Sequence, residues 1–101
     1  MFAFLAVVGL CVVGCSKKAD VTDDVLNAAI KESNDYGMHA DVFLRAARTL
    51  VGEGRCSVKD LEYNGGFSRK TGASSIYFIV CGSTIADRWY VDASDGRVYQ
   101  Q

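Results

Sequence analysis

The sequence predicts an α+β domain, in which two helices pack on a three- or four-stranded antiparallel sheet and one disulfide crosslinks the fold. Three observations predict this class. Apolar residues recur at helical spacing between residues 22 and 51, continuous or alternating apolar runs follow residue 75, and an Asp-Gly pair separates the last two runs. A chain of 101 residues has room for one such domain. We place it at residues 22–101.

The first predicted helix begins at Thr22, whose hydroxyl can accept a hydrogen bond from a free backbone N–H at the helix start. Asp23 and Asp24 follow in the first turn, where the helix dipole favours acidic side chains. We expect this helix to run to about Ser33, where the polar segment 34–37 breaks it. Its apolar face is formed by Val25, Leu26, Ala29 and Ile30.

The second predicted helix runs from about Asp41 to the glycines at 52 and 54, which stop it. Arg45 and Arg48 lie opposite its apolar face. That face is formed by Phe43, Ala46, Ala47, Leu50 and Val51. Each helix has one apolar side, so both are expected to cover a shared core.

The strands are predicted in the second half of the chain. Residues 57–60 can cap a helical turn, and residues 67–69 are expected to form a short edge strand. The run 76–81 is continuous, β-branched and aromatic, which is typical of a central strand covered on both faces or nearly so. Residues 88–93 and 97–99 flank Ser94-Asp95-Gly96 and are expected to form a hairpin.

Twelve of the first fourteen residues are apolar, and none is charged. Such a run is too short to span a bilayer but fits the apolar region of a secretory signal. It ends at Val12-Val13-Gly14-Cys15, which resembles the lipobox of bacterial lipoproteins. The alternatives are an uncleaved hydrophobic anchor and a buried N-terminal helix.

The lipobox resemblance implies that residues 1–14 are a signal peptide and that the thiol of Cys15 receives a diacylglycerol. The new amino terminus is then acylated, as with palmitate, and residues 15–21 form a tether to the membrane. It also implies a place in the cell envelope. Ser16 resembles the residue that sorts such proteins to the outer membrane, facing the periplasm.

Four cysteines are present, of which Cys11 would leave with the signal peptide and Cys15 would carry lipid. Cys56 and Cys81 then remain in an oxidising compartment, where we expect them to form a disulfide. The alternative is two separate buried thiols. No metal site is predicted, because no CxxC motif occurs and His39 is the single histidine.

No motif of catalysis or cofactor binding occurs, neither HExxH, GxSxG, GxGxxG nor a P-loop. We therefore predict a protein that is not an enzyme and needs no cofactor. The alternative from another class is a small hydrolase that uses His39 as its base. Nucleic-acid binding is not predicted, since the formal net charge is −1 and the signs are mixed.

The last strands supply a candidate binding surface of Arg88, Trp89, Tyr90, Arg97 and Tyr99. These residue types dominate the energetics of protein interfaces. Because side chains alternate along a strand, some of them point inward and others outward. The alternative is that the rings only stabilise the sheet through cross-strand pairs.

Residues 89–98 read WYVDASDGRV, which is similar to the closing hairpin of PepSY-type domains. That resemblance implies a secreted or periplasmic module that inhibits proteases. Our leading hypothesis is a non-enzymatic envelope lipoprotein, held to the membrane by its lipid, whose domain binds a protein partner. It would act as an inhibitor of a protease or cell-wall hydrolase, as a phage- or plasmid-encoded exclusion factor, or as an accessory of an envelope complex. A structural protein without a dedicated partner is the remaining alternative.

Overall fold

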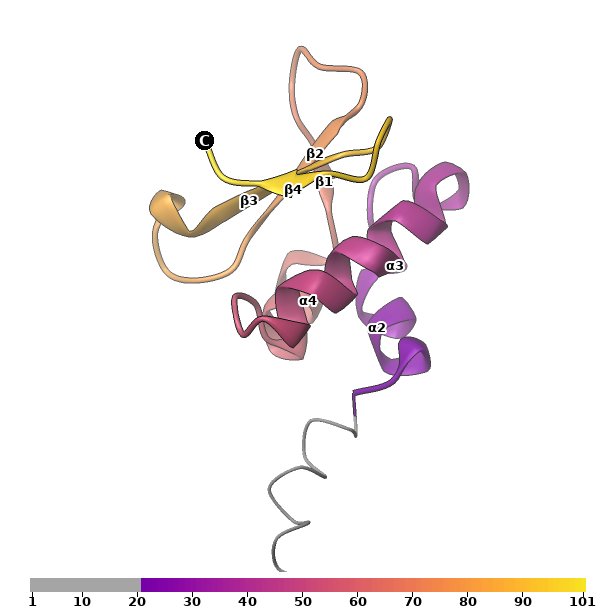
Figure 1. Ribbon diagram of the computed structural model, residues 1–101, viewed down its shortest axis with the longest axis vertical. Coiled ribbons are helices and arrows are strands. Elements are labelled where there is room, and N and C mark those ends of the chain that lie inside the picture. The colour runs from indigo at the N-terminus through magenta and orange to yellow at the C-terminus, as the bar shows by residue number, and fades with distance from the viewer. Residues whose placement is uncertain (1–20) are drawn as a thin grey trace, which may run out of the picture.

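The computed structural model describes residues 21–101, which form a helical layer and a sheet layer (Figure 1). Residues 1–20, with the predicted signal peptide, Cys15 and most of the tether, lie outside this part. The helices are α2 (Asp23–Ile30), α3 (Tyr36–Gly52) and α4 (Val58–Asn64), with the 3-10 helix η1 (Ile85–Asp87). The strands are β1 (Ser68–Arg69), β2 (Ile76–Val80), β3 (Arg88–Asp92) and β4 (Val98–Tyr99).

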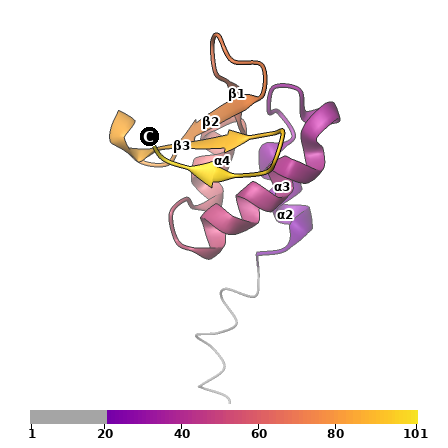
Figure 2. The same cartoon turned by 45° about the horizontal axis from the view of Figure 1, so that its top comes forward.

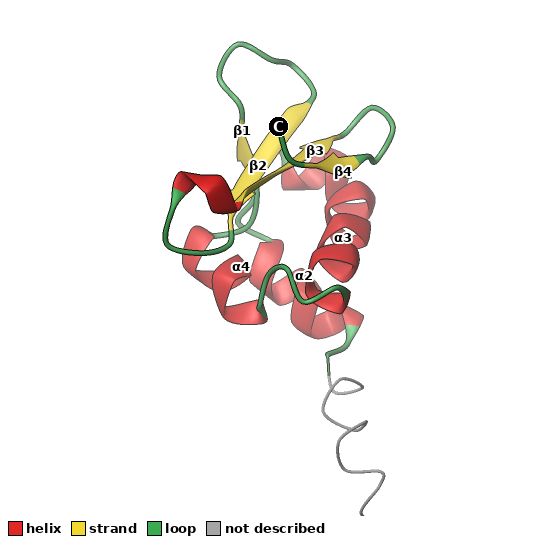
Figure 3. Cartoon of the chain, turned by 60° about the vertical axis from the view of Figure 1, so that its left-hand side comes forward, coloured by secondary structure: helices red, strands yellow, loops and turns green. Residues whose placement is uncertain are grey.

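The sheet has four antiparallel strands in the order β1-β2-β3-β4, so each strand pairs with its neighbours in the chain (Figure 2). The three α-helices lie on one side of it (Figure 3). The predicted α+β class is therefore confirmed. The sheet has four strands, within the predicted range, and the helical layer has three α-helices where two were expected. The predicted hairpin is also confirmed, and Gly96 supplies its positive φ of 81°.

Helix α2 begins as predicted, because the Thr22 hydroxyl accepts a hydrogen bond from the Val25 N–H at 3.3 Å. It ends at Ile30, three residues before the predicted end at Ser33. The reason lies in Ser33, whose hydroxyl donates to the Ile30 carbonyl at 2.6 Å and accepts from the Phe67 N–H at 2.8 Å. These two bonds turn the chain out of the helix.

Helix α3 begins at Tyr36, five residues before the predicted start at Asp41. Asp35 precedes it with a φ of 57°, and His39 interrupts the helical geometry with a φ of −126° and a ψ of 24°. The first turn is therefore separated from the rest by a kink. The apolar periodicity marks only the regular part beyond this kink.

Helix α4 was expected only as a helical turn. Its capping box is present, since the Asp60 N–H donates to the Ser57 hydroxyl at 3.0 Å and the Ser57 N–H donates to the Asp60 carboxylate at 2.9 Å. Only Leu61 of this helix is buried, so its sequence shows almost no apolar periodicity.

The core lies between the helices and the inner face of the sheet. Its largest fully buried side chains are Tyr77, Phe43, Phe67, Ile30, Leu50, Leu61, Ile79 and Val91. The predicted disulfide is confirmed: Cys56 in the α3–α4 connection bonds to Cys81 directly after β2, with 5.1 Å between the Cα atoms. It links the helical layer to the central part of the sheet.

Strand β2 is central, as predicted, but the sequence had also suggested cover on both faces or nearly so, and the helices cover only one face. Tyr77 and Ile79 are buried under the helices, whereas Ile76, Phe78 and Val80 on the other face are half-buried. We call that second face, which the three α-helices leave open, the outer face. Its apolar residues explain why the run along β2 is continuous.

Candidate functional site

Three aromatic side chains form a row on the outer face. In the antiparallel register, Phe78 of β2 lies opposite Tyr90 of β3, and Tyr90 lies opposite Tyr99 of β4. Residues that are directly opposite project to the same face, so the row crosses three neighbouring strands. The rings of Tyr90 and Tyr99 stack with 5.5 Å between their centroids and 23° between their planes.

Two arginines complete this site. The Arg88 guanidinium lies over the Phe78 ring, 4.5 Å from its centroid, and the Arg97 guanidinium lies 4.6 Å from the centroid of Tyr99. Attraction to the ring electrons holds each guanidinium in place. We call Phe78, Arg88, Tyr90, Arg97 and Tyr99 the arginine–aromatic cluster.

The cluster has a buried centre and an accessible rim. Tyr90 is only 7% exposed, although it lies outside the hydrophobic core. Phe78, Arg88 and Tyr99 are half-buried, and the Arg97 side chain is 60% exposed. A partner can contact the accessible members of the cluster, and these include arginine and tyrosine, two residue types that are enriched in binding hot spots.

The two arginines differ in their ionic partners. Arg97 lies 3.7 Å from the carboxylate of Asp92. Within residues 21–101 Arg88 has no ion pair, and its Nε atom is buried without a hydrogen-bond acceptor. The cluster therefore carries positive charge that this part of the chain does not neutralise.

The Asp92 carboxylate accepts hydrogen bonds from donors other than Arg97. The Ser94 hydroxyl donates to its carboxylate at 2.6 Å, the Ser94 N–H at 2.9 Å and the Ser75 hydroxyl at 3.1 Å. These bonds, with the Ser94 hydroxyl first, hold the pKa of Asp92 below its ordinary value. The carboxylate thus remains charged but serves mainly to fix the β3–β4 turn.

Trp89 lies on the other side of the sheet from the cluster. It is opposite Ile79, packs against the core, and has the Arg55 guanidinium 4.9 Å from its ring centroid. The structure therefore brings together four of the five residues predicted for a binding surface and separates Trp89 from them. Phe78 was missed, because a continuous apolar run conceals which residues face outward.

A second group of polar residues lies beside His39. Its ring makes edge contacts with Tyr77 and Phe43, at centroid distances of 5.5 Å and 5.9 Å. The Asp35 carboxylate accepts hydrogen bonds from the Tyr77 hydroxyl at 2.7 Å and from the Arg69 guanidinium. We call Asp35, Arg69 and Tyr77 the corner clamp, since they join the start of α3 to β1 and β2.

The corner clamp shifts two pKa values. The bonds from Arg69 and then from Tyr77 lower the pKa of Asp35, and burial, followed by the bond to Asp35, raises the pKa of Tyr77. The Tyr77 hydroxyl is therefore protonated at neutral pH and donates to Asp35. It does not serve His39 as a nucleophile in this arrangement.

An open depression lies beside His39. It is lined by Gly37, Met38, His39, Ala40, Asp41, Val42, Arg45 and Ala93. In the described part of the chain, no group of three or more His, Cys, Asp or Glu residues is placed to hold a metal ion. We find no arrangement of these side chains that pairs His39 with a nucleophile.

Among the helices of residues 21–101, none combines the length and the apolar character needed to cross a bilayer. Comparison of the chain with protein-family models, with curated proteins and with solved structures found no match.

Proposed function

We propose that this protein is a lipid-anchored protein of the bacterial cell envelope, whose domain binds another protein through the outer face of its sheet and performs no catalysis. One observation carries the binding part of the proposal. The outer face, which the three α-helices leave open, presents the arginine–aromatic cluster.

The composition of the cluster supports protein binding. Tyrosine and arginine are enriched among residues that dominate interface energetics, because they combine a large apolar contact area with polar groups. The stacking of Arg88 on Phe78 and of Arg97 on Tyr99 restricts the side chains before a partner arrives. Less conformational entropy is then lost on binding.

The proposed lipid anchor favours a partner protein that lies in the cell envelope. A lipid on Cys15 would leave seven residues, 15–21, as a tether, which spans at most about 25 Å when extended. The domain would then meet proteins at the membrane surface at a high effective concentration. Roles of this class are inhibition of a protease or cell-wall hydrolase, action as a phage- or plasmid-encoded exclusion factor, and support of an envelope complex.

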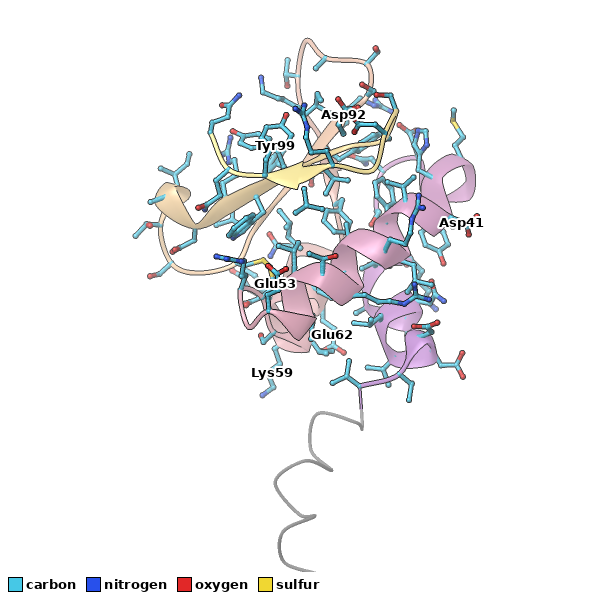
Figure 4. The ribbon with its side chains drawn as sticks, viewed as in Figure 1. Asp41, Glu53, Lys59, Glu62, Asp92 and Tyr99 are labelled. Carbon is cyan, nitrogen blue, oxygen red and sulfur yellow. A yellow bond between two sulfur atoms is a disulfide. The ribbon has the colours of Figure 1, made fainter. Side chains whose placement is uncertain are left out.

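Affinity capture from the envelope of the native host tests the proposal. The wild-type protein should recover a partner protein in stoichiometric amount, and the double variant Arg88→Gln/Tyr99→Ala should lose it. Lys59→Gln is the matched control, because Lys59 is an exposed residue of α4 on the helical layer, far from Tyr99 (Figure 4). Recovery of the same proteins by the double variant would contradict the proposal, as would recovery of none by the wild type.

A further inference from the structure

We infer that the segment bound by the arginine–aromatic cluster is acidic and extended, with one carboxylate at Arg88 and a second at Arg97. This inference rests on the proposed function and adds the chemistry of the partner. It follows from the charges of the cluster, from the occupied state of the neighbouring carboxylates, and from the spacing that the sheet register imposes.

Arg88 is the first anchor. Its guanidinium is held on Phe78, and its Nε atom is buried without an acceptor among residues 21–101. A buried donor without an acceptor is unfavourable, and a guanidinium bonds best to a carboxylate, which accepts two parallel hydrogen bonds. The buried Nε atom itself is closed to a partner, so a partner carboxylate would bond to the Nη groups of Arg88 and neutralise the unpaired charge of the guanidinium.

Arg97 is the second anchor. Its guanidinium leans on Tyr99, and its side chain is 60% exposed. The 3.7 Å separation from Asp92 is longer than a hydrogen bond, so its donors remain free for a closer acceptor. Asp92 and the solvent weaken the field of its positive charge without occupying its donors.

The nearest carboxylates of the domain have donors of their own. Asp92 accepts from Ser94 and Ser75, Asp95 accepts from the Arg97 N–H at 2.9 Å, and Asp87 accepts from the Thr84 N–H and hydroxyl. None of them bonds to the guanidinium of Arg88. The cluster is therefore complementary to added negative charge.

The register sets the spacing of the two anchors. Phe78 and Tyr99 lie on strands that are separated by one strand, so the strands that carry the two rings under the guanidinium groups are about 10 Å apart. In an extended segment, residues four apart point to the same side and lie about 13 Å apart, within reach of flexible Glu or Asp side chains. The residue midway between them would rest over the centre of the row, where an apolar side chain fits.

Panning a displayed library of random dodecapeptides against the purified full chain tests this inference. Enriched peptides should carry two acidic residues four apart with an apolar residue midway. By fluorescence anisotropy, each enriched peptide should bind Arg88→Gln and Arg97→Gln at least about tenfold more weakly than the wild type. Binding should also weaken as the salt concentration rises, because accessible charges are screened.

Two controls keep the result specific. Lys59→Gln removes the same charge from the helical layer and should bind the peptides like the wild type. Arg97→Gln changes an exposed side chain, so its thermal midpoint should match that of the wild type and its loss of binding cannot come from unfolding.

Several outcomes would overturn the inference. The first two are enrichment of neutral or basic peptides and no enrichment at all. A third is that both arginine variants bind the enriched peptides as the wild type does. A fourth is that the protein binds no acidic peptide but binds anionic phosphatidylglycerol vesicles through its arginines. If Tyr99→Ala abolishes capture of the native partner while both arginine variants retain it, the acidic chemistry is wrong and the proposed function stands. If the double variant Arg88→Gln/Tyr99→Ala captures the native partner as the wild type does, the proposed function itself is wrong.

Discussion

Ser33 is the one polar side chain that is buried within residues 21–101, at 7% exposure. Its hydroxyl donates to Ile30 and accepts from the Phe67 N–H, so it joins the end of α2 to the segment that leads into β1. Gly66 packs against it so closely that an added Cβ would lie 2.1 Å from the hydroxyl oxygen. A single hydroxyl thus fixes the path of two segments.

We expect Ser33→Ala to lower the free energy of unfolding by about 1–3 kcal/mol, because the buried Phe67 N–H is left without its acceptor. Chemical denaturation of the variant and the wild type measures the difference. Ser83→Ala is the control, since Ser83 is exposed and should change stability by less than about 0.5 kcal/mol. Equal effects of the two substitutions would show that the Ser33 bond contributes nothing.

At the scale of the elements, the disulfide is the strongest link between the layers, because it ties the α3–α4 connection to the end of β2. Closing such a loop stabilises a fold by about 3 kcal/mol in the chain-entropy model. We expect Cys56→Ser/Cys81→Ser to lower the thermal midpoint by more than about 10 °C. Calorimetry of the double variant measures this, and a change of only a few degrees would refute it.

The corner clamp predicts how stability depends on pH. The pKa of Asp35 is lower in the folded state than in the unfolded chain, because Arg69 and Tyr77 donate to its carboxylate. The resulting stabilisation is therefore present above the ordinary pKa of an aspartate, about 4, and is lost as the pH falls through the lower, folded value.

We expect Asp35→Asn to reduce the loss of thermal stability between pH 7 and pH 3. Asparagine tolerates the positive φ of residue 35, so the substitution tests charge and hydrogen bonding more than backbone strain. Part of the acid sensitivity should remain, since the pKa values of Asp23 and Asp92 are also lowered. A variant with the full acid sensitivity of the wild type would exclude Asp35 as a contributor.

The elements also show where sequence reasoning succeeds. The α2 cap, the β3–β4 hairpin and the cysteine pair are local or compositional signals, and the structure confirms each. The start of α3 was misplaced because of the kink at His39, and α4 was reduced to one turn because it buries only Leu61. Neither the backbone angles at His39 nor a short helix with one buried residue leaves much trace in the apolar pattern.

For the candidate binding surface, the residue types were predictable and their arrangement was not. Strand alternation separates Trp89 from Arg88 and Tyr90, but only the burial of Tyr77, Ile79 and Val91 in the core shows which face the helices cover. Phe78 belongs to the cluster through the pairing of β2 with β3. A site made from three strands can thus be predicted only when the strand register is known, and no single segment encodes that register.

At the scale of the whole molecule, the proposed lipid anchor would decide where the domain acts. We predict that mass spectrometry of the protein from its host membrane will show an acylated Cys15 at the N-terminus. Cys15→Ser should move the protein from the membrane fraction to the soluble fraction, because the lipid acceptor is gone. Detection of intact Met1, or an unchanged distribution of the Cys15→Ser variant, would contradict the lipoprotein prediction.

The position of the disulfide has a consequence for survival among proteases. The bond closes a covalent ring that contains α4, β1, β2 and the polar loop of residues 70–75. Any single backbone cut within that ring leaves both fragments attached, and the noncovalent core can hold the nicked chain together. If the domain lies in the cell envelope, as proposed, a protease can therefore cut the loop of residues 70–75 while the outer face stays assembled.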